Sequence, residues 1–467
     1  MLQITKKNQR ECLYSLCFIE DRCCMKDLTN GKEGRLILQF ALPMLLGNVF
    51  HQLYNVVDSV IVGKFIGKEA LAAVGASFPV IFVFFALVLG ISSGSTVVIS
   101  QYFGAGDNEK VKKTVDTLFI FLFFASMVVG ALGFIFSREV FLLLQLPEEV
   151  IPMAEIYLKI FFGGIIASFG FMGVSASLRG LGDSKTPLYF LIISTVFNIG
   201  FDILFVVVFN WGIAGVAFAT VLAQGGAFIT ALIYLNRTHQ IIQFSFLNLR
   251  FDWQLFRQSM RIGLPTGVQQ TVVAMGMMTL VGIVNQFGTN VIAAYSVAAR
   301  VNSLATLPAM NFSRALATFV GQNLGAKKEE RVKTGFVATL KMSSVVSVLV
   351  TLLVVFYGTF IMNLFTNDAE VVRVGVEYLM IVGSFYLVFS AMFVTSGVLR
   401  GAGATLIPMI TTIISLWGIR IPGAYFLSER IGETGIWWSI PIGWFMGLVM
   451  AYAYYLTGKW KKKVVVN

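Results

Sequence analysis

The sequence predicts an all-α polytopic membrane protein whose twelve transmembrane helices form two pseudo-symmetric six-helix lobes. Composition is the first reason: 57% of the 467 residues are hydrophobic, 13% are charged, and the mean hydropathy is +0.80. A soluble domain carries about 25% charged residues. The second reason is a series of apolar runs of about 20 residues or more, the length that crosses a bilayer as a helix and not as a barrel strand. The third is an internal repeat that relates the two halves of the chain.

The apolar runs are joined by short loops, which indicates one bundle and not membrane anchors attached to a soluble domain. We expect spans at residues 36–62, 72–103, 115–136, 153–177, 188–208, 212–236, 262–285, 292–323, 335–362, 374–398, 408–427 and 433–457. The predicted parts of the chain are a cytoplasmic leader (1–35), an N-terminal lobe (36–236), a cytoplasmic linker (237–261), a C-terminal lobe (262–457) and a basic cytoplasmic tail (458–467).

Lysine and arginine gather before the first span, after the even-numbered spans and in the tail, for example around Lys110 and Lys327. The loops after most odd-numbered spans carry few of them. Cytoplasmic loops are the ones enriched in Lys and Arg, so both termini are predicted on the cytoplasmic side of the cell membrane. The net charge of +11 is then a topology signal, and we expect no nucleic-acid partner.

Matched motifs recur about 221 residues apart along the whole chain. Gln101-x-x-Gly104-Ala105 returns as Gln322-x-x-Gly325-Ala326, and Tyr157-Leu158 returns as Tyr378-Leu379. Leu178-Arg179-Gly180-x-Gly182 returns as Leu399-Arg400-Gly401-x-Gly403. Each half contains an even number of spans, so both halves begin on the same side and their pseudo-two-fold axis follows the membrane normal. Parallel repeats of this kind are a transporter architecture, with the substrate between the repeats near mid-membrane.

Some polar residues lie deep within the predicted spans. His51, Tyr54, Asn55 and Asp58 share one face of the first span because they are three, four and seven residues apart. Asn198 with Asp202 and Thr220 with Gln224 are spaced four apart on the fifth and sixth spans. A carboxylate at bilayer depth costs about 2.5–3.5 kcal/mol, so it normally faces a protein interior or a wet cavity. The oxygen atoms suit a hard cation, and two neighbouring carboxylates readily share a proton, so Na⁺ and H⁺ both stay open.

Several longer motifs make the sequence resemble the multidrug and toxic compound extrusion (MATE) family. They are LYNVVDSVIVGKFIG (53–67), ALAAVG (70–75), QYFGAGD (101–107), LRGLGDSKTP (178–187), NIGFD (198–202), GIAGVAFAT (212–220) and LRGAGATLIP (399–408). The resemblance covers nearly everything after Met25 and implies a V-shaped pair of six-helix lobes. It also implies antiport of organic, often cationic, compounds against Na⁺ or H⁺. In the DinF-like branch, cation coupling is carried by residues that match Asp58, Asn198, Asp202 and Thr220.

The function expected is therefore secondary active multidrug efflux by a monomer that exchanges drugs or toxic organic cations for H⁺ or Na⁺ by alternating access. The alternative is a flippase or exporter of a lipid-linked or polysaccharide precursor, which would need a strongly basic central cavity. We expect no enzyme activity and no cofactor beyond the coupling ion, because no metalloprotease, Walker or Ser-His-Asp signature is present. The turns at Arg179–Gly182 and Arg400–Gly403 are interpreted as tight cytoplasmic loops.

Further side chains are assigned secondary roles. His51, Gln52, Tyr54 and Gln224 are candidates for the cavity wall or a proton relay, and Pro43 and Pro265 are candidate hinges at equivalent places in the first and seventh spans. Three deep arginines of the C-terminal half, Arg300, Arg314 and Arg420, are expected to cap helices or pair with carbonyl groups in preference to binding an anionic substrate.

Overall fold

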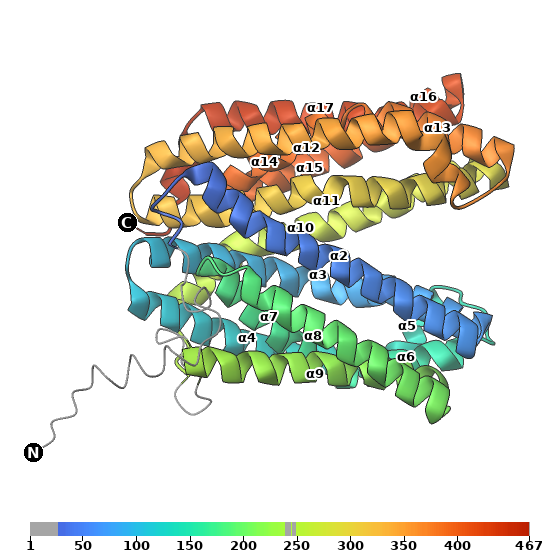
Figure 1. Ribbon diagram of the computed structural model, residues 1–467, viewed down its shortest axis with the longest axis horizontal. Coiled ribbons are helices and arrows are strands. Elements are labelled where there is room, and N and C mark those ends of the chain that lie inside the picture. Colours follow the sequence, from blue (N-terminus) through green and yellow to red (C-terminus); the bar gives the residue numbers. More distant parts are fainter. Residues whose placement is uncertain (1–26, 239–243, 245–248, 467) are drawn as a thin grey trace, which may run out of the picture.

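The computed structural model describes residues 27–238, 244 and 249–466. Most of the predicted leader and the middle of the predicted linker lie outside these residues. Within them the chain is helical and contains no strand. Figure 1 shows most helices of the two halves in two layers, with α2 and α10 running between them and the described ends of both termini at the same end of the bundle.

The N-terminal lobe contains eight α-helices and one π-helical segment. They are α2 (Glu33–Phe65), α3 (Lys68–Gly104), α4 (Asn108–Ile135), α5 (Ser137–Leu143), α6 (Ile151–Gly163), α7 (Ile165–Gly180), α8 (Lys185–Asp202), the π-helical η1 (Ile203–Val208) and α9 (Gly212–Thr238).

The C-terminal lobe follows the same order. It comprises α10 (Trp253–Val284), η2 (Asn285–Phe287), α11 (Thr289–Gly325), α12 (Glu329–Asn363), α13 (Ala369–Gly383), α14 (Tyr386–Gly401), α15 (Leu406–Ile413), the π-helical η3 (Ile414–Arg420), α16 (Ile421–Ile431), α17 (Glu433–Leu456) and η4 (Lys459–Lys463). Helix α10 begins at Trp253, so its first turns fall within residues 237–261, the predicted linker.

The twelve predicted spans are confirmed as helical segments. In the described part of the chain nine helices are long and apolar enough to cross a membrane, and two bent pairs raise that number to 11. These pairs are α6 with α7, bent by 51°, and α13 with α14, bent by 47°. They are the fourth and tenth spans, which are equivalent in the repeat. Helix α11, which carries Arg300 and Arg314, supplies the remaining span.

Two helices, α2 and α10, pass from one lobe to the other. Ile37 and Phe40 near the start of α2 are buried among α11, α12 and α14 of the C-terminal lobe, whereas Ile61 and Val62 belong to the core of the N-terminal lobe. Helix α10 does the reverse: Leu255 and Ile262 pack in the N-terminal lobe, and Leu280, Ile283 and Val284 pack in the C-terminal core. Each helix therefore links both hydrophobic cores.

Glycines make the contact between the lobes possible. Gly90 and Gly94 of α3 lie against the backbone of Gly263 and Gly267 of α10, and a Cβ added to Gly90 would lie 2.4 Å from the Gly267 nitrogen. Where α3 crosses α11, a Cβ on Gly104 would lie 1.9 Å from the Gln322 carbonyl oxygen. No side chain fits at these positions, so the helix axes approach closely, as small residues allow in membranes.

Two repeat-equivalent glutamines join the lobes at the end where the termini lie. Gln101 Nε2 donates to the Gly401 carbonyl at 2.9 Å, and Gln322 Nε2 donates to the Gly180 carbonyl at 3.2 Å. Their carbonyl oxygens accept from backbone N–H groups of the two chain ends, Val465 for Gln101 and Leu28 for Gln322. The lobes are thus closed at the end that the charge pattern predicts to be cytoplasmic.

We predict that Gly90→Ala weakens this closure, because its methyl group has no room against α10. Overpacking of this kind costs about 1–3 kcal/mol. The matched control is Gly75→Ala in the same helix, where an added Cβ meets nothing within 4 Å. Thermal unfolding in detergent and distances between spin labels on the two lobes would report the change. Equal behaviour of the two variants would contradict the contact.

Candidate functional site

The four predicted coupling residues are all buried inside the N-terminal lobe. Asp58 of α2, Asn198 and Asp202 of α8, and Thr220 of α9 are 7%, 1%, 0% and 6% exposed. The carboxyl groups of Asp58 and Asp202 interact directly. The Tyr54 hydroxyl lies 3.1 Å from Thr220 Oγ1 in a hydrogen bond. Asn198 lies one turn before Asp202 on the same face of α8.

The polar atoms of this cluster are poorly satisfied by the protein. Among the described residues, Asp58 Oδ1, both carboxyl oxygens of Asp202, and both Oδ1 and Nδ2 of Asn198 are buried without a conventional hydrogen-bond partner. Buried polar groups are normally paired, and a buried group without a partner is a place where an ion, a water molecule or a shared proton can bind. The donor set, carboxylate and amide oxygens with a hydroxyl, fits a hard monovalent cation as well as it fits a shared proton.

The local backbone explains how Asp202 is placed. Helix α8 ends at Asp202 and continues directly as the π-helical segment η1. Wide π turns are rare and occur often at functional sites, since they shift the register of the side chains that follow. The equivalent span of the other lobe also contains a π-helical segment, η3, which ends at the buried Arg420.

Tyr157 belongs to this cluster, although it was predicted only as a marker of the repeat. Its buried phenol on α6 interacts electrostatically with both Asp58 and Asp202. The repeat-equivalent Tyr378 interacts with Arg420 in the other lobe. The recurrence of a tyrosine at the same place in both halves was the sequence signal that could have indicated this position.

The remaining predicted wall or relay residues lie around the cluster. His51 and Gln52 are exposed on α2, and Gln224 is half-buried on α9. The His51 ring lies 3.4 Å from Asn55 Nδ2, and its centroid is 5.9 Å from that of Tyr54. In the described residues no hydrogen bond joins His51 to either carboxylate. A role for His51, Gln52 or Gln224 in a relay stays a prediction.

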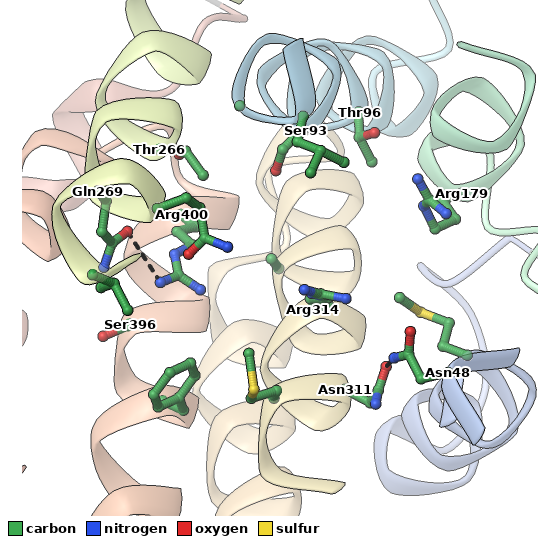
Figure 2. A pocket seen from close by; sticks show the side chains of 18 of the residues that line it. Asn48, Ser93, Thr96, Arg179, Thr266, Gln269, Asn311, Arg314, Ser396 and Arg400 are labelled. Atoms are coloured by element: carbon green, nitrogen blue, oxygen red, sulfur yellow. Dashed lines mark hydrogen bonds between the residues drawn. The ribbon is translucent and has the colours of Figure 1, made fainter. Parts of the chain in front are cut away.

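A cavity of about 550 Å³ lies between the lobes. Its wall comes from α2, α3, α7 and α8 of one lobe and from α10, α11, α14, α15, η3 and α17 of the other. Pro43 and Met277 line it, whereas Asp58 and Asp202 do not. Figure 2 shows polar side chains from both lobes around this space, including Asn48, which donates to Asn311 Oδ1 at 2.8 Å.

The charged side chains that line this cavity are all arginines: Arg179, Arg314, Arg400 and Arg420. Arg314 and Arg420 were expected to serve helix ends, and Arg179 and Arg400 to belong to cytoplasmic turns. The turns are present, since Gly182 and Gly403 have φ angles of +84° and +85°, but both arginine side chains enter the cavity (Figure 2). Arg300 does not line this cavity.

Helix α2 connects the cavity with the coupling cluster. Pro43, Met44, Gly47 and Asn48 face the cavity, and Tyr54 and Asp58 face the cluster. The rise of 1.5 Å per residue places Asn48 and Asp58 about 15 Å apart along the helix axis. The same helix therefore contributes side chains both to the cavity wall and to the buried polar cluster.

Known proteins match this chain over nearly its whole length. The MatE family model matches residues 43–204 and again residues 265–426, which confirms the repeat. The probable multidrug resistance protein YpnP of Bacillus subtilis is 33% identical over 435 residues, covering 93% of this chain and 97% of the relative. An FAD transporter of Shewanella oneidensis is 23% identical over 445 residues, covering 92% and 96%.

The fold recurs in a solved structure described as the outward-facing conformation of a multidrug resistance MATE family transporter of the MOP superfamily. The TM-score is 0.85 at 22% identity, and the match covers 93% of this chain and 96% of that one. The family model in both halves, the YpnP likeness and the two-lobed helical fold agree, and the chain belongs to the MATE family of transporters.

Proposed function

We propose that this protein is a secondary active efflux transporter that exports organic compounds through the central cavity in exchange for H⁺ or Na⁺. The observation that supports ion coupling is the cluster of buried, unpaired oxygen atoms at Asp58, Asn198 and Asp202. Family membership and relatives named for multidrug resistance support efflux.

The cluster supplies a physical reason for coupling. Two carboxylates in contact repel each other when both are ionised. A proton shared between them, or a Na⁺ held by Asp58, Asp202, Asn198 and Thr220, removes that repulsion. Binding then draws α2 toward α8, and release of the ion lets the two helices separate.

Helix α2 transmits this change because it also packs against the C-terminal lobe through Ile37 and Phe40. Pro43 lies between this packing and the coupling cluster, where it removes a backbone hydrogen bond and permits a bend. In this mechanism ion binding and bending at Pro43 shift the lobes between two states. Pro265 in α10 has the corresponding place on the other side.

We place the protein in the cell membrane as a monomer with both termini in the cytoplasm. Both described chain ends lie at the same end of the bundle (Figure 1), and the Lys- and Arg-rich loops lie there too. The two lobes of a single chain supply the wall of the cavity, so the proposed transport needs no second copy.

A second candidate, export or flipping of a lipid-linked or polysaccharide precursor, is favoured by one observation. Such a substrate carries phosphate or carboxylate groups, and arginines line the cavity. The matched relative named FAD transporter is named for a substrate that also carries phosphates.

We predict that Asp58→Asn and Asp202→Asn each reduce gradient-driven export to the level of protein-free vesicles while the protein still folds. Each change removes one carboxylate that the coupling ion needs. Asp116→Asn is the control, because Asp116 is also buried but lies near Lys112 and Arg250, outside the cluster. Gradient-driven export in proteoliposomes and thermal unfolding in detergent are the measurements. Full export by the Asp58 variant would refute the coupling assignment.

Proteoliposomes with one imposed gradient at a time identify the coupling ion. If H⁺ couples, a pH gradient without Na⁺ drives export and Asp202→Asn abolishes it. If Na⁺ couples, a Na⁺ gradient at equal pH drives export instead. Transport without either gradient, unaffected by substitutions in the cluster, would contradict secondary active antiport.

A further inference from the structure

We infer that the central cavity binds an amphiphilic organic anion whose phosphate, sulfonate or carboxylate group is held by Arg314 between Arg179 and Arg400. This inference rests on the proposed function, because it names the class of substrate that the same cavity carries. It departs from the cationic substrates that the family resemblance implies.

The charge of the cavity wall is the first argument. Four arginines line the space, and no aspartate or glutamate of the described residues lines it. The ion pairs within the described residues join other side chains, such as Arg331 with Glu33 and Arg373 with Glu370. Buried charges in proteins are normally paired. The unpaired guanidinium groups therefore need an anion, whereas a cationic substrate would meet only like charge.

The arrangement of the arginines is the second argument. Figure 2 shows Arg314 between Arg400 on one side and Arg179 on the other. Arg314 interacts electrostatically with both, which places the like charges within range of one another. The three arginines come from α7, α11 and α14 and line one cavity, so both lobes can contribute to binding the same anion. Planar guanidinium forks suit phosphate and carboxylate oxygens.

Neighbouring groups hold Arg400 in position without neutralising its charge. Arg400 Nη2 donates to Gln269 Oε1 at 3.3 Å, and its guanidinium carbon lies 5.9 Å from the centre of the Phe393 ring. Arg400 Nε and Arg420 Nε are buried without an acceptor among the described residues. Arg420 is only 8% exposed. Donors remain free, and the fourth arginine extends the basic wall toward α17.

The rest of the wall indicates that the anion is amphiphilic. Methionine and aromatic side chains from both lobes line the cavity beside the arginines: Met44, Met277, Met310, Met392, Phe389 and Trp444. Methionine adapts to irregular apolar shapes. One charged group on the arginines and an apolar body on this surface would fill the space.

Matched dyes test the charge preference in purified protein in detergent. Fluorescein is an anionic xanthene, and rhodamine 123 is a cationic xanthene of similar size. We expect fluorescein to bind and rhodamine 123 to bind at least tenfold more weakly, a difference of about 1.4 kcal/mol. Arg314→Gln should weaken fluorescein binding at least tenfold. Arg300→Gln should leave it unchanged, since Arg300 lies on the same helix outside the cavity wall.

Two results would overturn the inference: tighter binding of rhodamine 123 than of fluorescein, or equal loss of fluorescein binding in both arginine variants. Arg314→Lys is a second variant for the case in which the glutamine variant fails to fold, and it should retain part of the affinity for fluorescein. Thermal unfolding shows which variants are folded.

A further experiment distinguishes the two sources of an anionic cargo, a lipid headgroup and a soluble compound. Fluorescently labelled phosphatidic acid in vesicles reports lipid translocation, and fluorescein trapped in vesicles reports transport of a soluble anion. Translocation of the lipid alone would assign the anion to a lipid headgroup, and export of fluorescein alone would assign it to a soluble compound; either supports an anionic cargo.

The same measurements separate this inference from the proposed function. Fluorescein binding that persists in Asp58→Asn, with no gradient-driven export by the wild type, would retain the anion site and refute ion coupling. Gradient-driven export of rhodamine 123 but not of fluorescein would refute the anion site and retain coupled efflux.

Discussion

The exchange of α2 and α10 between the lobes is the constraint on which the rest of the structure depends. Each helix begins in the hydrophobic core of one lobe and ends in that of the other, so neither lobe can rotate as an isolated body. The glycines of α3 and α10 let the lobes meet backbone to backbone. Pro43 lies in α2 between Phe40, which packs in the C-terminal lobe, and the buried Asp58. Pro265 lies in α10 between Gly263 and Gly267, which pack against α3. Pro43 and Pro265 stay the predicted hinges of these two helices.

The two lobes share a scaffold but carry opposite charges in equivalent spans. In the fifth span Asp202 lies where α8 becomes π-helical, and in the eleventh Arg420 ends the π-helical η3. Tyr157 and Tyr378, which are equivalent in the repeat, lie beside these charges. The N-terminal lobe can thus attract a cation away from the cavity, and the cavity can attract an anion. Separate sites of opposite sign keep the coupling ion and the cargo from neutralising each other directly.

Most of the fold and the burial of Asp58, Asn198, Asp202 and Thr220 could be predicted from the sequence, because each left a local signal. Spans are visible as apolar runs, and Asp58 is conspicuous because a carboxylate inside such a run is costly. The basic cavity left no comparable signal. Arg179 and Arg400 follow apolar runs at the predicted cytoplasmic ends, where arginines normally mark topology. Whether such a side chain turns outward or into a cavity depends on how α7 and α14 pack, and this is decided by contacts between distant parts of the chain. For Arg314, the sequence indicated a position deep in a span, but it did not indicate that the described residues supply no acidic partner for this side chain.

The proposed acidic coupling site and the proposed basic cargo site together have an energetic consequence for transport by alternating access. Moving one elementary charge through the membrane potential is worth about 2.3 kcal/mol per 100 mV. Exchange of a monovalent organic cation for one H⁺ or Na⁺ moves no net charge, so the potential contributes nothing. Exchange of a monovalent anion outward for one cation inward moves two charges in the favourable direction when the cell interior is negative, worth about 4.6 kcal/mol per 100 mV. With the proposed anionic cargo, the potential assists both halves of the cycle: it draws the cation toward Asp58 and Asp202, and it drives the anion away from Arg314.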